Sequence, residues 1–287
     1  MKLTEIFNSD KPTLSFEVFP PKTGDTYDSI RSSVLEIAKL APSYMSVTYG
    51  AGGGNSLYSL DIAKEVKNAG VTPLAHLTCV GASHEKIENH LAALKEAGIE
   101  NVLALRGDLP EGNGNAACHD FKYASELVSK ISSFGGFCIG GACYPESHPE
   151  SPDSFSDIEN LKRKVDAGCS FLTTQMFFDN NVYYNFLYRL YKAGIDVPVI
   201  PGIMPVTNPA SILRICKISG CALSQRFVRI VDRFKDDREA LAQAGIAFAT
   251  EQIIDLYANG VNAVHVYSMN KPEIAGKIKE NLSAILK

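Results

Sequence analysis

A glutamate near the amino-terminus has the sequence surroundings of an active-site residue. Glu17 lies within an apolar segment, residues 14–19, and two prolines follow this segment at once. Barrel enzymes of the parallel α/β class carry their chemistry at the ends of such strands. Glu17 is therefore a candidate active-site carboxyl group; a carboxylate exposed at the edge of a loop is the alternative.

Further polar side chains stand in or at the ends of later apolar segments. Arg106 and Asp108 close one segment, His76 lies in another and Gln175 ends a third. An arginine suits an anionic ligand, and a buried amide must find a hydrogen-bond partner. In the alternative interpretation, Arg106 and Asp108 form a structural ion pair and His76 packs in the core.

A set of polar residues shares one side of a later helix. Asp157, Asn160 and Lys164 are spaced i, i+3 and i+7, which brings them to one helix face. Together they can grip a polar ligand. From composition alone, the basic run at residues 162–164 favours a solvated helix face instead.

Eight segments have the length and apolar content of buried strands. Helical spacing of apolar residues separates them, and an Ala-Gly or Asn-Gly pair marks several of the helix ends. The eight expected strands are residues 13–19, 44–50, 72–80, 101–108, 136–144, 170–177, 197–203 and 263–268. This alternation predicts a TIM (β/α)8 barrel, a fold that typically takes ~250 residues.

We expect one catalytic domain over residues 1–287, with a short amino-terminal extension before the first strand. A doubly wound sheet needs fewer strands and a switch point. The glycine-rich run at residues 50–54 lacks the third glycine of a dinucleotide fingerprint and the Lys-Ser/Thr of a P-loop. A loop at the barrel mouth is the preferred interpretation of this run.

Alternation of side chains along a strand predicts which of them face the barrel axis. In the first strand Glu17 faces inward. In the fourth strand Leu103 is expected to face outward, whereas Ala104, Arg106 and Asp108 face inward. Polar groups from several strands should then meet at the carboxyl-terminal mouth of the barrel, where active sites of this fold lie.

Composition argues against several other classes of protein. The net charge is −4 without a large basic block, which is unlike a general nucleic-acid binder. Apolar runs are too short for a membrane helix and no signal-peptide core begins the chain, so a cytoplasmic protein is expected. Seven cysteines without a Cys-x-x-Cys and six scattered histidines favour buried thiols over a metal site.

Nine short motifs in this order resemble the methylenetetrahydrofolate reductase family, and they extend from the first expected strand to the last. Each motif is weak alone, but nine in register are specific. They are residues 15–22 (SFEVFPPK), 47–51 (VTYGA), 76–79 (HLTC), 104–110 (ALRGDLP), 144–149 (YPESHP), 161–168 (LKRKVDAG), 174–179 (TQMFFD), 201–206 (PGIMPV) and 267–270 (YSMN).

The resemblance implies a flavoprotein of one-carbon metabolism and methionine biosynthesis. FAD would be bound at the barrel mouth, NADH or NADPH would reduce it, and methylenetetrahydrofolate would then accept the hydride to give 5-methyltetrahydrofolate. Glu17 would be the general acid that opens the five-membered ring of the folate, and Asp108 would tune flavin and pterin. Gln175 and Lys271 match substrate positions. A homo-oligomer or a redox partner subunit is compatible with these expectations.

The resemblance also assigns the positions that hold FAD or lie beside it. Arg163 and Lys164, with Arg106, carry the positive charge that a diphosphate needs. The full set is Thr48, Tyr49, Ala51, His76, Arg106, Gly107, Asp108, Tyr123, Ala124, Tyr144, His148, Asp157, Asn160, Arg163 and Lys164.

Three departures from the family pattern concern the electron donor and the substrate. The loop after the second strand lacks the family's charged run, and the region at residues 208–215 lacks its aromatic residue and glutamine. Lys271 stands where an arginine is usual. Two alternatives therefore stay open: a folate-binding barrel of another reaction type, and a subunit that needs a partner protein as electron donor.

Overall fold

A single parallel sheet forms the wall of the molecule in the computed structural model, which describes residues 1–49, 56–108, 120–209, 212, 216 and 219–287. All strand pairings in it are parallel, and the order of its nine strands is β7-β6-β5-β4-β3-β2-β1-β9-β8. The strands are β1 (Thr13–Val18), β2 (Met45–Val47), β3 (Pro73–Thr78), β4 (Asn101–Leu105), β5 (Cys138–Cys143), β6 (Phe171–Thr174), β7 (Val199–Ile200), β8 (Gly202–Ile203) and β9 (Ala263–Tyr267).

The sheet closes through one expected strand that the structure divides in two. β7 pairs with β6, whereas β8 pairs with β9. Pro201 separates the two pieces, because proline has no N–H to donate to a ladder. Its carbonyl still accepts a hydrogen bond from His265 N at 3.0 Å. The predicted TIM-type α/β barrel is confirmed, with its seventh strand, expected at 197–203, present as β7 and β8.

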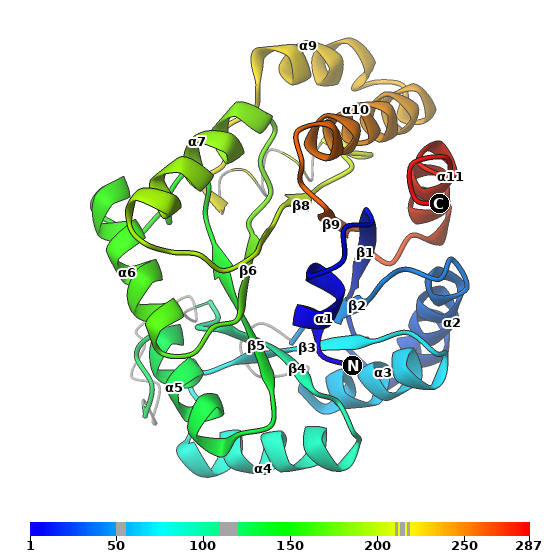
Figure 1. The fold of residues 1–287 in the computed structure, drawn as a ribbon. Helices are drawn as coiled ribbons and strands as arrows, with labels where there is room; N and C mark the ends of the chain where they lie inside the picture. The colour runs from blue at the N-terminus through cyan, green and yellow to red at the C-terminus, as the bar shows by residue number, and fades with distance from the viewer. Residues whose placement is uncertain (50–55, 109–119, 210–211, 213–215, 217–218) are drawn as a thin grey trace.

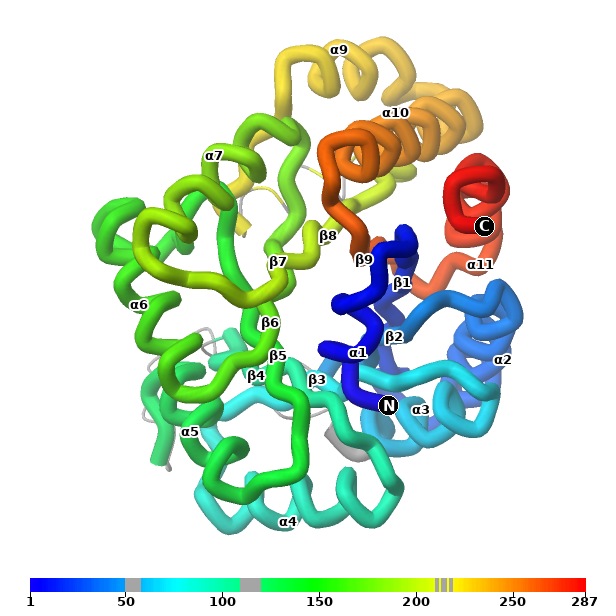
Figure 2. The backbone as a smooth tube through the Cα atoms, in the orientation of Figure 1, coloured from blue at the N-terminus to red at the C-terminus, as the bar shows by residue number. Residues whose placement is uncertain are grey.

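Helices surround the strands as an outer layer (Figure 1, Figure 2). In α4 the apolar residues Ile87, Leu91 and Leu94 are buried, and Ser83 caps the first turn by accepting a hydrogen bond from Lys86 N. The described helices are α1 (Leu3–Phe7), η1 (Gly24–Thr26), α2 (Tyr27–Ala38), α3 (Ser56–Asn68), α4 (His84–Glu96), α5 (Ala124–Phe134), α6 (Ser154–Asp166), α7 (Asn180–Lys192), α9 (Gln225–Phe234), α10 (Arg238–Ala258) and α11 (Pro272–Asn281).

The amino-terminal helix α1 closes one end of the barrel, and it lies inside the ring of strands in Figure 1. Leu3 N donates to Asn101 Oδ1 at 2.8 Å, at the start of β4. The ring of Phe7 packs edge-on against Tyr44 and Phe171 at centroid distances of 5.9 and 5.1 Å. Because this end is filled with apolar side chains, polar chemistry is left to the carboxyl-terminal end of the strands.

The predicted facing of the fourth strand is wrong by one residue. Leu103 packs inside the barrel with Leu3, Leu74 and Phe171, whereas Ala104 belongs to the layer between strands and helices. The register that pairs Leu103 with the inward-facing His76 requires this orientation. Apolar side chains fill the lower interior of a small barrel as well as its outer face, so hydrophobicity alone does not mark the outward residues.

Candidate active site

Glu17 lies inside the barrel at the carboxyl-terminal end of β1. It is in register with Ser46 on β2 and with Tyr267 on β9. The side chain of Glu17 is 21% exposed to solvent. Burial raises the pKa of Glu17 to about 8, and a hydrogen bond with Ser46 opposes that rise. The carboxyl group is therefore protonated at neutral pH, as a proton donor must be.

His76 on β3 is the other ionisable side chain beside this carboxyl. Its Nε2 lies 3.8 Å from Glu17 Oε2, which is too long for a hydrogen bond. Burial lowers the pKa of His76 to about 3, so the contact joins two neutral groups and is no salt bridge. The same Nε2 is buried and has no hydrogen-bond partner among the described residues. A buried polar atom without a partner is uncommon in folded proteins, and this one is available to hydrogen-bond a bound ligand.

A second buried histidine connects the strands below Glu17. His265 on β9 lies between two serines: Ser15 Oγ is 2.8 Å from Nδ1 and Ser46 Oγ is 3.0 Å from Nε2. Burial lowers the pKa of His265 to about 3, so this ring is neutral. His265 was not predicted as a site residue from the sequence. The alternation of β9, in which His265 and Tyr267 share a face, is the signal that identifies it.

Hydrogen bonds tie the loop after β9 to the end of β1. Ser268 Oγ donates to the carbonyl oxygen of Glu17 at 2.6 Å, and Asn270 bonds both the N–H and the carbonyl of Phe19 at 2.9 Å. Lys271 follows, and its Nζ donates to Thr207 Oγ1 at 3.1 Å. Lys271 lines a groove of about 620 Å³ between α10 and α11, and no described contact joins its side chain to Glu17.

A cleft of about 500 Å³ opens on the other side of the mouth. It is formed by the end of β4, the start of α5, the loop after β5 and one face of α6. Nine of the sequence-predicted cofactor positions line it together: Arg106, Tyr123, Ala124, Tyr144, His148, Asp157, Asn160, Arg163 and Lys164. Residues separated by up to 58 positions (Arg106 to Lys164) therefore meet in one cavity.

Three cationic side chains line this cleft. Arg106 makes a bidentate pair with Glu150, with Nη–Oε distances of 2.5 and 2.7 Å. Lys164 Nζ donates to the carbonyl oxygen of Ala142 at 2.6 Å, and burial lowers the pKa of Lys164. Arg163 Nη1 donates to its neighbour Asn160 at 3.2 Å. The cleft therefore carries positive charge that suits an anionic group, although the guanidinium of Arg106 is already paired with Glu150.

The loop after β5 is held in shape by Asp157 of α6. Its carboxylate accepts from His148 N at 3.2 Å and from Ser151 Oγ at 2.9 Å. The ring of Tyr144 packs against the ring of His148 at 4.6 Å. Asp157 therefore shapes this loop, and Tyr144 and His148 both line the cleft.

The remaining predicted positions lie at strand ends outside the cleft. Tyr49 packs its ring edge-on against His90, on the helix side of the sheet. Asp108 is exposed at the rim, and Gln175 Oε1 accepts from its neighbour Met176 N at 3.0 Å. Thr48 N donates to Val18 O at 3.0 Å, which joins β2 to β1. Ala51 falls outside the described residues.

Gly107 provides the turn that brings Arg106 into the cleft. It has φ of +90°, and a Cβ atom there would lie 2.8 Å from Cγ1 of Val80. Only glycine meets both conditions without strain. The partner of Arg106, Glu150, was not predicted, because 44 residues separate the two and no local pattern connects them.

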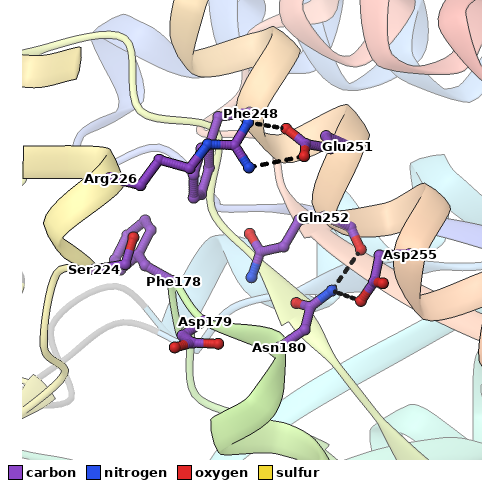
Figure 3. Close-up of a pocket in the computed structure, with 9 residues that line it drawn as sticks. All are labelled: Phe178, Asp179, Asn180, Ser224, Arg226, Phe248, Glu251, Gln252 and Asp255. Atoms are coloured by element: carbon purple, nitrogen blue, oxygen red, sulfur yellow. Dashed lines mark hydrogen bonds and ion pairs between the residues drawn. The ribbon is translucent and has the colours of Figure 1, made fainter. Parts of the chain in front are cut away.

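A second pocket, of about 330 Å³, lies between α7, α9 and α10 (Figure 3). Arg226 forms a bidentate ion pair with Glu251. Asn180 donates to the carbonyl oxygen of Gln252 and to Asp255 Oδ2, at 3.0 and 2.6 Å. These interactions join α9 and α7 to α10, and they engage the charged groups of Arg226, Glu251 and Asp255. We therefore interpret the pocket as structural.

Two further classes of site find no support within the described part of the chain. No group of three or more His, Cys, Asp or Glu side chains there is arranged to hold a metal ion. No described helix has both the length and the apolar character that crossing a membrane requires.

Comparison with known proteins gives matches over almost the whole chain. The family model described as methylenetetrahydrofolate reductase matches residues 2–283. The chain is 36% identical over 270 residues to the 5,10-methylenetetrahydrofolate reductases of Escherichia coli (strain K12) and Pectobacterium carotovorum subsp. carotovorum. These matches cover 94% of this chain and 90% and 89% of the two proteins.

A plant relative is longer than this chain. Methylenetetrahydrofolate reductase (NADH) 1 of Arabidopsis thaliana is 33% identical over 301 residues, and the match covers 99% of this chain and 50% of the plant protein. The chain therefore spans about half the length of that relative.

A solved structure shares the fold at 14% identity. It is described as an uncharacterized protein from Clostridium thermocellum that binds two copies of 5-methyl-5,6,7,8-tetrahydrofolic acid, and it matches with a TM-score of 0.72 over 99% of both chains. At this identity the likeness shows the fold alone. The sequence matches establish the family that the nine motifs predicted: the chain belongs to the methylenetetrahydrofolate reductase family.

Proposed function

We propose that this chain reduces 5,10-methylenetetrahydrofolate to 5-methyltetrahydrofolate, with FAD as its bound cofactor and NADH or NADPH as the electron donor. The observation that carries the proposal is the position of Glu17, a carboxyl group protonated at neutral pH at the barrel mouth. Family membership and the names of the bacterial relatives support the choice of substrate.

The cleft at the mouth fits FAD in its chemistry. Arg106, Arg163 and Lys164 would hold the diphosphate through charge-assisted hydrogen bonds. Lys164 is the strongest of these observations, because its buried ammonium group makes its described hydrogen bond to a carbonyl oxygen, and the charge of Asp157 only partly offsets the burial that lowers its pKa. Bound there, the flavin would supply the hydride transfer that side chains cannot perform.

Tyr267 connects Glu17 with the cleft. Burial, then the charge of Glu17 and, more weakly, Cys143 and Tyr144 of the cleft, raise the pKa of Tyr267. Tyr267 also donates to Thr174 O at 2.5 Å. Thr174 is in register with Cys143 of β5, which lines the cleft, and Tyr267 is in register with Glu17. A cofactor in the cleft and a substrate above Glu17 would therefore be neighbours across the mouth.

Glu17 would protonate a ring nitrogen of the folate and so open its five-membered ring. Three features of the chain suit that role. Its carboxyl keeps the proton up to about pH 8, neutral His76 does not compete as a charged partner, and paired strands, β2 and β9, flank it on both sides. Asp108 at the rim would tune the flavin and pterin, and Gln175 and Lys271 would contact substrate.

An absorption spectrum of the purified protein tests the proposal. We expect a bound flavin that NADH or NADPH bleaches under anaerobic conditions and that methylenetetrahydrofolate then reoxidises. Glu17→Gln should leave reduction by the nicotinamide intact and slow the folate step by about 10²-fold or more. Glu96→Gln, the same change at an exposed carboxylate of α4, is the matched control.

Each other outcome has a distinct meaning. A protein that stays colourless when FAD is supplied contradicts the proposal. In another outcome, neither nicotinamide bleaches the bound flavin, but folate reoxidises it after chemical reduction. The folate step of the proposal then stands, and the electron donor is another molecule. Equal loss of both steps in Glu17→Gln indicates a structural role for Glu17.

A further inference from the structure

Two cysteines that the candidate active site does not use lie with their sulfur atoms in contact. The Sγ atoms of Cys216 and Cys221 are 3.4 Å apart, and the hydroxyl oxygen of Ser219 lies 3.1 Å from Cys221 Sγ. No other hydrogen bond joins two cysteine side chains in the described part of the chain. The contact is therefore particular to this pair.

The end of a helix brings the two cysteines together. Cys216 and Ser219 are helical, and Gly220, with φ of +72°, follows in the left-handed conformation. Gly220 N donates to the carbonyl oxygen of Cys216 at 2.9 Å, which is the bond of a glycine helix cap. In such a cap the chain reverses, and the residue after the glycine packs against the last helical turn. Cys221 therefore meets Cys216 because Gly220 lies between them.

A small movement is enough to bridge the pair. A disulfide bond is ~2.0 Å long, so the two sulfur atoms need to approach by about 1.4 Å. Cysteines whose side chains point apart cannot be bridged without movement of the backbone. The sulfur atoms of Cys216 and Cys221 are already in contact, so this obstacle is absent here.

Access and acidity determine how the pair reacts. Cys216 is partly exposed whereas Cys221 is only 7% exposed, so a dissolved oxidant reaches Cys216 first. Burial, and then the neighbouring thiol of Cys221, raise the pKa of Cys216 to about 12. Because the thiolate is the reacting form, the pair reacts slowly at neutral pH. It therefore differs from a catalytic dithiol, whose attacking thiol has a lowered pKa.

The segment that carries Cys221 contacts the loop after β5. Ala222 N donates to Glu146 Oε2 at 2.6 Å, and a Cβ atom on Gly220 would lie 3.0 Å from Cγ of Pro149. Glu146 and Pro149 belong to the same loop as residues that line the cleft at the barrel mouth. A covalent bond to Cys221 would therefore restrain the segment that supports this loop.

We propose that Cys216 and Cys221 are a thiol–disulfide site: a small disulfide oxidant such as oxidised glutathione converts them into an intramolecular disulfide, which restrains the support of the cleft loop. The thiolate of Cys216 attacks one sulfur of the oxidant and releases one glutathione thiolate. Cys221 then attacks Cys216 Sγ, forms the S–S bond and releases the second glutathione thiolate. Two cysteine thiols are oxidised, one disulfide is reduced, and the two released thiolates take up the two protons.

Tryptic mapping of the full-length protein detects this bond directly. Trypsin cleaves after Arg214, Lys217 and Arg226. The two cysteines therefore fall in separate peptides, residues 215–217 and 218–226. After equilibration with oxidised and reduced glutathione and alkylation of the remaining free thiols, we expect these peptides to be joined in one species. Its mass should be that of the two peptides less two hydrogen atoms, and dithiothreitol should separate them.

The equilibrium constant against glutathione tests whether the fold prepares the pair. Contact in the folded protein should raise this constant by about 10-fold or more over that of the same chain unfolded in urea. Cys138→Ala, at a buried cysteine at the start of β5, is the matched control and should form the joined peptides as the wild type does. Cys216→Ala should form none, and Cys221→Ala should give only a mixed disulfide of Cys216 with glutathione.

Hydrogen exchange tests the restraint on the loop. In the oxidised wild-type protein the amide of Ala222, which bonds to Glu146, should exchange more slowly than in the reduced protein, and so should the amides of residues 144–148. Cys216→Ala treated with the same oxidant should show no such change, because it cannot form the bond.

Joined peptides together with slower exchange would support the proposal. Absence of joined peptides at equilibrium overturns it, as does an equilibrium constant that is no higher in the folded protein than in urea. Joined peptides without slower exchange overturn the restraint on the loop. The wild-type measurements decide even if a variant does not fold. None of them needs flavin, nicotinamide or folate, so a failure of the proposed function is distinguishable from a failure of this inference.

Discussion

Replacing Glu17 by glutamine should stabilise the folded protein, and by an amount that grows with pH. In the unfolded chain a glutamate loses its proton near its ordinary pKa of 4.5, whereas in the folded protein burial holds the pKa of Glu17 at about 8. The folded state therefore binds more protons between these two values. Its stability falls as pH rises through this interval, and a glutamine at the same place avoids that loss.

The size of the effect follows from the two values. Each pH unit corresponds to 1.36 kcal/mol, so the loss is about 3 kcal/mol at pH 7 and about 5 kcal/mol above pH 8. These are upper values, since 21% of the side chain stays exposed and solvent screens part of the cost. At pH 5 the difference should be below about 1 kcal/mol.

Urea denaturation of wild type and Glu17→Gln at pH 5, 7 and 9 measures this difference directly. Glu96→Gln makes the same chemical change at an exposed position of α4 and should show no comparable trend. The reasoning is refuted if the gap between Glu17→Gln and wild type is the same at pH 5 and pH 9. In that case Glu17 ionises freely in the folded protein and is no proton donor at neutral pH.

Three more predictions concern packing and the cleft. Gly245→Ala should lower the free energy of unfolding by about 3 kcal/mol or more in urea denaturation, because the new Cβ would lie 1.8 Å from the backbone oxygen of Val206. Gly276→Ala is the contrasting change: its nearest neighbour is 4.0 Å away, so it should stabilise α11 by about 0.5–1 kcal/mol. Arg106→Lys loses the two-pronged contact that a guanidinium makes, and titration of the apoprotein with FAD should show about 10-fold weaker binding or more. Lys164→Met should weaken FAD binding. The variant should stay folded by circular dichroism, since burying an ammonium group destabilises the fold and methionine removes that cost. Unchanged FAD affinity would show that Lys164 does not contact the cofactor.

Local patterns were sufficient for the architecture. Apolar segments of strand length, helical spacing between them and glycines after the helices predict a parallel barrel, because each strand and helix must bury its apolar face against the next. The same patterns located Glu17, since a carboxyl within an apolar strand is a local anomaly. The division of the seventh strand at Pro201 was also visible locally, but it was not predicted.

The facing of β4 shows where such patterns fail. Leu103 and Ala104 are both apolar, and only the pairing of Leu103 with His76 across two strands decides which of them points inward. A small barrel has apolar side chains on both sides of its wall. Strand register, which is a contact between distant residues, therefore carries information that alternation within one strand lacks.

The residue types that suit proton donation and anion binding, and their order along the chain, are determined by the sequence alone. Only the tertiary structure decides how they are charged and partnered. Glu17 keeps its proton because the barrel wall buries most of its side chain, and Arg106 meets Glu150 because the segments after the neighbouring strands β4 and β5 approach each other. Desolvation and hydrogen-bond partners depend on distances between segments far apart in the chain, and folding sets those distances.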